Sequence, residues 1–360
     1  MESLVMDKMH DSYFWKGKRV LVTGHTGFKG SWLTLWLHNL GASVMGVGLA
    51  PLTSPNLFEA ANISELCEHH ICNINDKYSL ASLVRLFQPD IIFHLAAQAL
   101  VRESYRNPVN TFETNIMGTV HLLEAVRGVS SVKSMVMVTT DKVYSNASSI
   151  WPCRETDTLG GHDPYSASKA ACELVINSYR DAFLAEQGIV LASARAGNVI
   201  GGGDWSADRL IPDAIRAWQG GGNLLIRNPE AIRPWQHVLE PISAYLTLAK
   251  HLYESSAFSG AYNFGPHSHE LASVKDVIME ARNVFGKGEV TWCGSSDEPY
   301  EAEYLALETT KANIRLGVIP RWSLLDAIKQ TMTWYKDWYH GYEARELCQQ
   351  QIDLFEKGGR

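Results

Sequence analysis

The sequence predicts an α/β fold, a Rossmann-type doubly wound parallel sheet with a smaller, partly discontinuous C-terminal domain. Three observations lead to this prediction. Short apolar runs alternate with segments of helical periodicity over the first 196 residues, as in parallel sheets covered on both faces. A glycine-rich turn lies between the first apolar run and the first helical segment. After residue 196 glycine, proline and tryptophan become frequent, which indicates a second, more irregular unit.

The apolar periodicity places the elements in order along the chain. Buried strands are expected at residues 19–23, 42–49, 90–95, 135–140 and 188–195. Helices are expected at residues 28–40, 76–87 (capped by Asp76), 108–127, 166–186 and 323–340. The segment CEHHIC at 67–72 is interpreted as a strand entering the core, because a zinc site needs a second ligand pair nearby. We therefore expect no metal.

Composition excludes several classes of protein. The 360 residues are 46% hydrophobic and 20% charged, which is typical of a globular chain. A net charge of −7 argues against a nonspecific partner of nucleic acid, which would be basic. The N-terminus lacks the apolar core of a signal peptide, and the six cysteines are scattered. We expect reduced thiols and a cytoplasmic location.

One stretch is unusual, since no Asp or Glu occurs from residue 12 to residue 58. Polar residues and glycines interrupt it before any apolar run long enough to span a membrane, so no membrane partner is expected. Dinucleotide folds usually place an acid about 20 residues after the glycine turn to hold the ribose. Here neither that acid nor an arginine is present, so the local sequence does not decide between NAD and NADP.

The glycine turn Thr23–Gly30 has the spacing of a phosphate-binding loop. Gly24 permits a tight turn, Gly27 lets a pyrophosphate approach the backbone, and Gly30 allows close packing of helix on strand. The helix that follows offers free N–H groups and a favourable dipole to the anion.

A second pattern, Tyr165 followed by Lys169, opens a predicted helix. The spacing places both side chains on one face. A nearby ammonium lowers the pKa of a phenol, so Tyr165 is expected to act as a base near neutral pH. Thr140, at the end of a predicted strand, is positioned to hydrogen-bond the same substrate hydroxyl.

With these motifs the chain resembles the extended short-chain dehydrogenase/reductase family. TGHTGFKG (23–30) resembles its glycine turn, HLAAQ (94–98) its fourth-strand motif, and Asn115 its structural helix asparagine. The resemblance implies NAD as cofactor, Thr140, Tyr165 and Lys169 as catalytic residues, and an NAD-binding domain at 1–196 with returning segments near 236–265. The implied cofactor contacts are Gly24, Thr26, Gly27, Phe28, Lys29, Gly30, Asn73, Ile74, Leu95, Ala96, Ala97, Tyr165 and Lys169.

Within the family, the sugar-nucleotide 4,6-dehydratases are most similar. They carry a Thr-Asp-Glu or Thr-Asp-Lys triplet, and this chain has Thr140-Asp141-Lys142. The strings RAGNVIGGGDW and IRPWQHVLEP resemble the branch acting on CDP-glucose. The resemblance implies oxidation at C4 of the hexose, loss of water across C5 and C6, and return of hydride to C6, as a step in deoxysugar biosynthesis.

The resemblance also implies roles for the triplet. Asp141 is the candidate acid near C6, which requires a raised pKa. Lys142 is either the C5 base, which requires a neutral amine, or a cation that stabilises the enolate. Asn73 departs from the family, which usually has Asp there, so a cofactor contact at Asn73 is in question.

The sugar nucleotide is assigned to a domain at 197–235 and 266–360. The implied substrate contacts are Gln98, Arg102, Asn198, Arg209, Arg227 and Arg233. A planar guanidinium suits bidentate contact with phosphate, and Arg233 is the preferred pyrophosphate ligand.

Two alternatives stay open. One is another enzyme of the superfamily, a 4-epimerase or a dehydratase of UDP- or dTDP-sugars. The other is an inactive dinucleotide-binding regulator, which the intact Thr140, Tyr165 and Lys169 argue against. Family members usually dimerise through two helices, here about 108–127 and 166–186, so a homodimer or higher homo-oligomer is expected.

Overall fold

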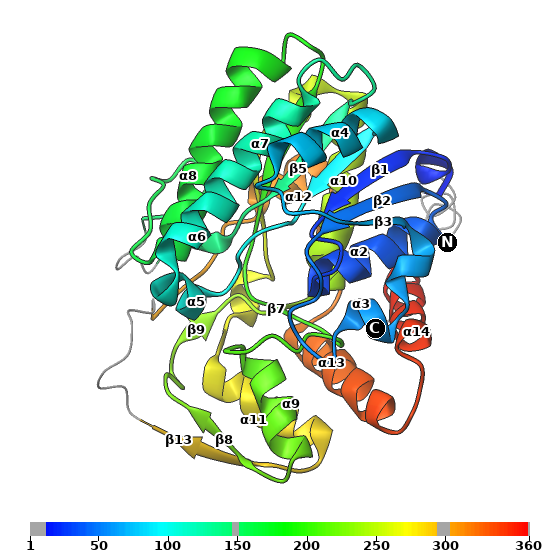
Figure 1. Cartoon of the computed structure of the whole chain (residues 1–360). Coiled ribbons are helices and arrows are strands. Elements are labelled where there is room, and N and C mark those ends of the chain that lie inside the picture. The colour runs from blue at the N-terminus through cyan, green and yellow to red at the C-terminus, as the bar shows by residue number, and fades with distance from the viewer. Residues whose placement is uncertain (1–11, 146–150, 294–302, 359–360) are drawn as a thin grey trace.

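A single parallel sheet organises the computed structural model, which describes residues 12–145, 151–293 and 303–358 (Figure 1). Its seven strands lie in the order β3–β2–β1–β4–β5–β6–β11, and all neighbours are parallel. The strands are β1 Arg19–Thr23, β2 Ser43–Gly48, β3 Glu68–Ile71, β4 Ile91–His94, β5 Ser134–Val138, β6 Val190–Ala196 and β11 Gly260–Phe264. The order reverses between β1 and β4, and doubly wound sheets bind ligands at that point. The predicted fold class is confirmed.

Helices cover both faces of the sheet. Helices α2 and α10 pack on one face, and α4, α7 and α8 on the other. These helices are α2 Phe28–Asn39, α10 Leu239–Glu254, α4 Lys77–Phe87, α7 Gly118–Val126 and α8 Pro164–Tyr179. Shorter helices lie between them: α3 Leu57–Ala60, α5 Val101–Arg106 and α6 Pro108–Phe112, with 3-10 turns at Ile63–Leu66 and Asp141–Val143.

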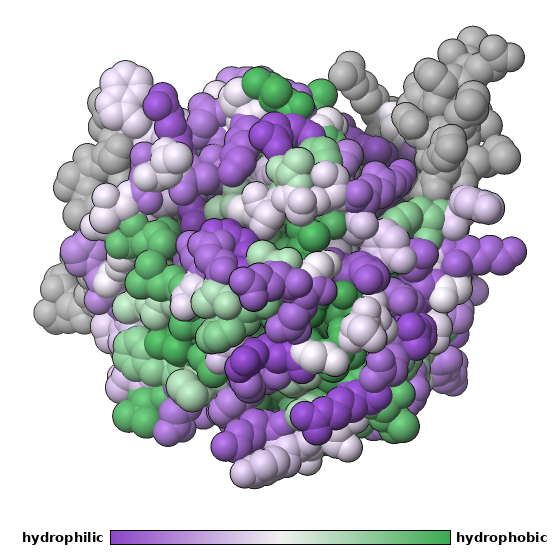
Figure 2. All heavy atoms as spheres, turned by 90° about the horizontal axis from the view of Figure 1, so that it is seen from above, coloured by the Kyte–Doolittle hydropathy of each residue, from purple (hydrophilic) through white to green (hydrophobic). Residues whose placement is uncertain are grey.

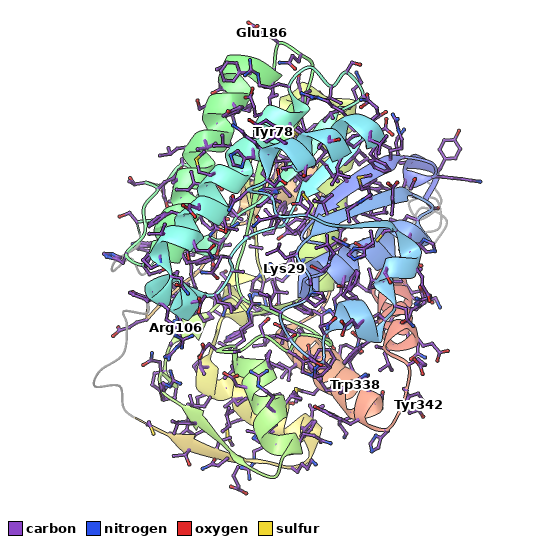
Figure 3. All side chains as sticks on the ribbon, in the orientation of Figure 1. Lys29, Tyr78, Arg106, Glu186, Trp338 and Tyr342 are labelled. Atoms are coloured by element: carbon purple, nitrogen blue, oxygen red, sulfur yellow. The ribbon has the colours of Figure 1, made fainter. Side chains whose placement is uncertain are left out.

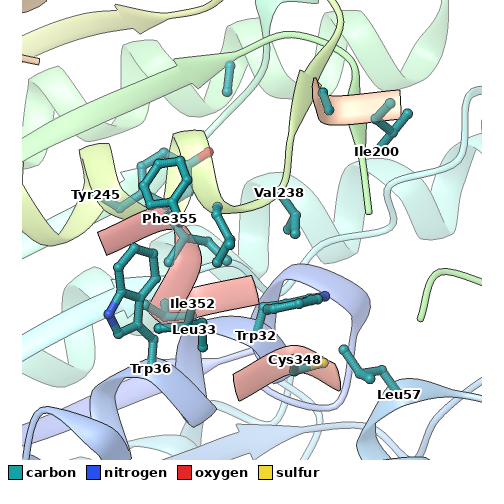
Figure 4. Close-up of a cluster of buried hydrophobic side chains, with 14 of the residues drawn as sticks. Trp32, Leu33, Trp36, Leu57, Ile200, Val238, Tyr245, Cys348, Ile352 and Phe355 are labelled. Atoms are coloured by element: carbon teal, nitrogen blue, oxygen red, sulfur yellow. The ribbon is translucent and has the colours of Figure 1, made fainter. Parts of the chain in front are cut away.

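The acid-free stretch is explained by burial. Every residue of α2 from Gly30 to Leu37 is buried, because the sheet packs on one side of the helix and α14 (Ala344–Glu356) on the other. Figure 4 shows Leu33 and Trp36 beside Ile352 and Phe355 of α14. A charge between Gly30 and Leu37 would be desolvated at high cost. Among the described residues, no helix has the length and apolar character needed to cross a bilayer.

Two expectations about elements differ from the structure. The helix expected at 108–127 is α6 and α7 joined through a π-helical turn at Glu113–Met117, and α8 continues into another at Arg180–Leu184. The CEHHIC segment contains β3, and only its end enters the core, where Cys72 is buried. β3 itself is the outer strand of the sheet, so its side chains are only half-buried or exposed. In the described part of the chain, no three His, Cys, Asp or Glu side chains are grouped to hold a metal.

Most of the second part of the chain lies below the sheet in Figure 1 and is built from small strand pairs and helices, whereas α12 (Thr310–Leu316) packs beside the sheet against β11. The pairs are β7 Val199–Ile200 with β10 Gln236–His237, β9 Ile232–Arg233 with β12 Ala272–Ser273, and β8 Asn223–Ile226 with β13 Glu289–Trp292. The helices are α9 Leu210–Gln219, α11 Val274–Phe285, α12 Thr310–Leu316 and α13 Leu324–Tyr339, with 3-10 turns at Ser256–Phe258 and Ser268–Glu270. The chain returns to the sheet with α10 and β11, while the proposed division into two domains stays a prediction.

Candidate active site

The glycine turn between β1 and α2 has no room for a side chain at Gly24 or at Gly30. Gly24 has a φ of +77°, and a Cβ there would lie 2.7 Å from the backbone nitrogen of Ala96. A Cβ on Gly30 would lie 2.1 Å from the carbonyl oxygen of Gly24. Gly27 is exposed at the start of α2, where no side chain caps the first N–H groups. These free donors and the helix dipole fit a pyrophosphate.

A histidine pair lies at the end of β2, where the ribose-binding acid is missing. The ring of His25 covers Gly46, whose Cβ would lie 2.2 Å from it, and His25 Nε2 hydrogen-bonds to His69 Nδ1 at 2.6 Å. Burial, and then the neighbouring His69, lower the pKa of His25 to about 4. Thr26 donates to the carbonyl oxygen of Leu49 at 2.7 Å. Polar but uncharged groups therefore occupy this place, and no local sequence pattern predicted the histidine pair.

The segment after β4 is fixed against β1. The backbone N–H of Leu95 donates to the carbonyl of Thr23 at 3.1 Å, and that of Ala96 to the Thr23 hydroxyl at 3.2 Å. The same hydroxyl hydrogen-bonds to His94 Nδ1 at 2.7 Å. The predicted contacts Leu95, Ala96 and Ala97 thus lie beside the glycine turn, and Phe28 begins the helix that follows the turn.

The predicted contacts after β3 lie in different environments. Asn73 is exposed, and its side-chain oxygen accepts the backbone N–H of Asn75 at 2.9 Å. Ile74 is buried against α7, where a Cβ on Gly118 would lie 2.3 Å from it. Whether either residue contacts a cofactor stays a prediction.

Asn115 joins the β4 loop to α8. It accepts the backbone N–H of Gln98 at 2.8 Å, and its amide nitrogen donates to the Gln98 carbonyl at 3.0 Å and to the Ser168 hydroxyl at 2.8 Å. The side-chain amide of Gln98 donates to Leu100 and Thr111, at 3.1 and 2.9 Å. The structural role expected of Asn115 agrees with these contacts, whereas the Gln98 side chain is hydrogen-bonded to its own loop and to Thr111 on α6.

The predicted catalytic residues come together at the carboxyl end of β5. Tyr165 and Lys169 lie one turn apart on α8, and both are buried, as are Thr140 and Asp141. Lys169 donates to the carbonyl oxygen of Val138 at 3.1 Å, and Thr140 donates to Asp141 Oδ1 at 3.0 Å. Within the described residues, Asp141 Oδ2 is buried without a hydrogen-bond partner. That oxygen is free to bind a ligand hydroxyl.

Electrostatics correct one expectation. Burial raises the pKa of Tyr165 to about 12, while a hydrogen bond with Thr140 and the charge of Arg209 act in the opposite direction. The expectation that Lys169 gives Tyr165 a near-neutral pKa is therefore wrong for the chain alone. Burial outweighs the effect of the Arg209 charge on the pKa of Tyr165. Burial also lowers the pKa of Lys169.

Further charged groups surround this cluster. Arg209 forms an ion pair with the buried Asp204 at 3.4 Å. Burial, and then the charge of Arg209, lower the pKa of Lys29 to about 8, against the attraction of Asp141. Figure 3 places Lys29 between the sheet and the second part of the molecule. Lys142 is half-buried in the turn after Thr140.

The remaining predicted substrate contacts are spread over both parts of the chain. Arg102 lies 3.8 Å from Asp208. Arg233 is buried, and its guanidinium donates to the backbone carbonyls of Ile232 and Glu303, at 2.8 and 3.3 Å. The two others are half-buried: Asn198 and Arg227. Their roles toward a substrate stay predictions.

Three features define a dinucleotide-dependent enzyme of the short-chain dehydrogenase/reductase type. They are the parallel sheet, the glycine turn at its switch point, and the cluster of Thr140, Tyr165 and Lys169. The family model described as GDP-mannose 4,6 dehydratase matches residues 21–331, and the chain belongs to this family.

Individual relatives refine the comparison. The chain is 47% identical to the CDP-glucose 4,6-dehydratase of Salmonella typhimurium over 350 residues, which covers 96% of this chain and 98% of that protein. It is 27% identical to the UDP-glucose 4-epimerase of Halalkalibacterium halodurans, covering 92% and 99%. The solved Thermus thermophilus UDP-glucose 4-epimerase complex with NAD has a TM-score of 0.76 at 26% identity, covering 88% of this chain and 99% of that one.

Proposed function

We propose that this chain is an NAD-dependent dehydratase that converts CDP-D-glucose to CDP-4-dehydro-6-deoxy-D-glucose. One observation carries the proposal. Asp141 lies buried beside Thr140, with one carboxylate oxygen that has no partner among the described residues. Oxidation and reduction at C4 need no such acid, whereas the loss of water from C6 does. The relative from Salmonella typhimurium supports CDP-glucose as the substrate.

The glycine turn fits NAD. Gly24, Gly27 and Gly30 leave the backbone open, and the start of α2 offers donors to the pyrophosphate. Tyr165 and Lys169 would hold the ribose next to the nicotinamide. When bound, NAD accepts a hydride from the substrate and later returns it.

The residues divide the proton transfers between them. Tyr165, which is hydrogen-bonded to Thr140, accepts the proton of the C4 hydroxyl in its phenolate form as C4 is oxidised. The C4 ketone makes the C5 proton acidic. Asp141 in its protonated form gives its proton to the C6 hydroxyl, which leaves as water. Lys142 either takes the C5 proton as a neutral amine, or stabilises the enolate as a cation while another group or water takes that proton. A proton then returns to C5 as the product forms.

The second part of the chain would bind the nucleotide. We place Arg209 at the hexose end of the substrate, because its positive charge lowers the pKa of both Tyr165 and Lys29. Cationic side chains suit the diphosphate because they neutralise its charge. We assign these contacts to Arg102, Arg227 and Arg233, with Asn198 and Gln98 as neutral partners.

A 4-epimerase or a dehydratase of another sugar nucleotide is the alternative. It is less well supported, because an epimerase leaves the acid at Asp141 without a task. In an inactive regulator, four buried polar residues would have no role that offsets the cost of their desolvation. These residues are Thr140, Asp141, Tyr165 and Lys169.

The decisive experiment incubates the protein and NAD with CDP-, dTDP-, UDP- and GDP-glucose in parallel. We expect a 4-keto-6-deoxy product from CDP-glucose, with no net reduced cofactor. Turnover confined to another nucleotide sugar would contradict the substrate, and formation of a 4-epimer without water loss would contradict the reaction.

We also propose that the protein forms a homodimer or higher homo-oligomer in the cytoplasm, through the helices at about 108–127 and 166–186, which include α6, α7 and α8. Figure 2 shows hydrophobic side chains on the side of the molecule where Figure 1 places these helices. Val109 and Leu174 are 67% and 62% exposed there. Sedimentation at several concentrations tests this assembly, and a monomer at every concentration would contradict it.

A further inference from the structure

A buried ion pair lies behind the candidate active site and has no task in the chemistry proposed above. Arg195 on β6 donates from Nε and Nη2 to the two carboxylate oxygens of Glu173 on α8, at 3.0 and 2.8 Å. The two side chains are 2% and 0% exposed. Such a pair gains little stability over apolar residues of the same volume, because both charges lose their hydration. Its value to the protein therefore lies in geometry.

Glu173 connects the two elements that carry the catalytic residues. It lies one helical turn after Lys169 on α8, so both side chains extend from the same face toward the sheet. Its Oε1 accepts the hydroxyl of Thr139 at 2.6 Å. Thr139 is bonded to Thr140, so the carboxylate holds the start of the catalytic turn against the catalytic helix.

Arg195 holds the other end of the same turn. Its Nη1 donates to the hydroxyl of Tyr144 at 2.8 Å. That hydroxyl donates in turn to Asn263 Oδ1 on β11 at 2.6 Å, and the Asn263 amide donates to the carbonyl of Cys153 at 2.9 Å. The segment from Thr139 to Tyr144 is thus fixed at both ends by one buried network.

We propose that Glu173 and Arg195 are a positioning pair, which keeps Thr140, Asp141 and Lys142 in register with Tyr165 and Lys169. This inference rests on the proposed function. Tyr165 acts at C4 and Asp141 at C6 of one hexose. If the turn shifted relative to α8, the two residues would no longer reach the same bound hexose together, and oxidation would proceed without water loss. Buried, charge-assisted hydrogen bonds suit this task, because each is short and fixed in direction.

The hydroxyls at the two ends of the turn provide the test. Thr139→Val and Tyr144→Phe each remove one hydroxyl with little change in shape. Thr139→Ser keeps the hydroxyl and should restore the wild-type properties. Ser193→Ala is the matched control, because Ser193 donates to the same carboxylate at 2.7 Å but lies on β6, outside the turn.

Two measurements separate positioning from general stability. Hydrogen exchange followed by mass spectrometry should show faster exchange across residues 139–145 in Thr139→Val and Tyr144→Phe. Ser193→Ala should not show this increase. The turnover of CDP-glucose should fall about tenfold to a hundredfold in the first two variants, while the Kd for CDP-glucose changes less than about threefold. Reduced nicotinamide should accumulate during turnover, because oxidation continues while water loss slows.

The outcomes distinguish this proposal from the proposed function. If the wild-type protein does not act on CDP-glucose, the proposed function is wrong, and the exchange data alone decide on the pair. Unchanged exchange in Thr139→Val and Tyr144→Phe overturns the positioning pair, and so does turnover equal to wild type. An equal effect of Ser193→Ala also overturns it, because the loss would then reflect stability rather than the position of the turn.

Discussion

Lys169 donates a hydrogen bond to the carbonyl oxygen of Val138 at 3.1 Å, and this bond fixes α8 to the last residue of β5. The ammonium is buried. Its partner is a strand carbonyl, so the position of the charge is set by the sheet and not by Tyr165.

We expect Lys169→Met to shift the pH dependence of the reaction. Tyr165 must lose its proton to act as a base, so kcat/KM rises with pH. Removal of a nearby positive charge raises the phenol's pKa further, which moves that rise to higher pH. A pH profile of kcat/KM measures the shift. Lys133→Met, at an exposed position, should leave the profile unchanged. An unshifted profile for Lys169→Met would show that its charge does not act on Tyr165.

Asp141→Asn should separate the two halves of the reaction. Asparagine keeps the size of the side chain but has no carboxyl proton to give to the leaving hydroxyl. We expect water loss to slow by about 10²- to 10⁴-fold while oxidation at C4 continues. Reduced nicotinamide should therefore accumulate after rapid mixing with CDP-glucose. If C4 oxidation and exchange of the C5 proton both disappear, the role given to Asp141 is wrong.

Lys142→Met tests the two roles left open for Lys142. A C5 base is required for exchange of the C5 proton with solvent, so its loss should abolish that exchange. Substrate recovered after incubation in deuterated water, with its C5 deuterium measured, provides the readout. Exchange slowed only about tenfold would favour enolate stabilisation, and undiminished exchange would remove Lys142 from either role.

Local patterns were sufficient to predict much of this molecule. The glycine turn, the strand before it and the pair of Tyr165 and Lys169 each depend on residues close in sequence, whose spacing determines which side chains share a face. That the candidate catalytic residues lie close together could be predicted, because Thr140 follows β5 and the carboxyl ends of parallel strands meet at one edge of the sheet.

The parts that were missed depend on contacts between distant segments. His25 and His69 are 44 residues apart, and they meet only because β3 pairs with β2. The pairing of Glu173 with Arg195 requires that α8 crosses β6. The high pKa of Tyr165 follows from tertiary burial, which no local spacing reports. The edge position of β3 likewise depends on the strand order, which periodicity does not contain.

The glycine turn allows cofactor binding to be tested apart from folding. A Cβ on Gly30 would lie 2.1 Å from a carbonyl oxygen, whereas one on Gly27 would meet its nearest atom at 3.4 Å. We expect Gly30→Ala to destabilise the fold by about 2 kcal/mol or more. Gly27→Ala should change the stability by less than about 1 kcal/mol but weaken NAD binding, because the methyl group stands where a pyrophosphate approaches. Urea unfolding and calorimetric titration with NAD measure the two effects. Equal NAD affinity in wild type and Gly27→Ala would place the pyrophosphate elsewhere.

Glu240 on α10 should make stability depend on pH. Its Oε1 accepts the backbone N–H groups of Arg321 and Trp322 at 2.9 and 2.7 Å, yet burial raises its pKa from 4.5 to about 7. The folded chain therefore holds this proton at pH values where the unfolded chain has lost it. The resulting stabilisation is complete below the unfolded pKa and disappears as pH rises through the folded one. The full difference is about 3 kcal/mol.

Glu240→Gln should remove this dependence, because an amide oxygen accepts both N–H groups and does not ionise in this range. Relative to wild type, the variant should gain about 2–3 kcal/mol of unfolding free energy between about pH 5 and pH 8. Urea unfolding at a series of pH values measures the difference. Glu254→Gln, exposed on the same helix, should follow the wild-type curve. Parallel curves for wild type and Glu240→Gln would mean that Glu240 ionises equally in the folded and unfolded chains, and that its two backbone hydrogen bonds offset its burial.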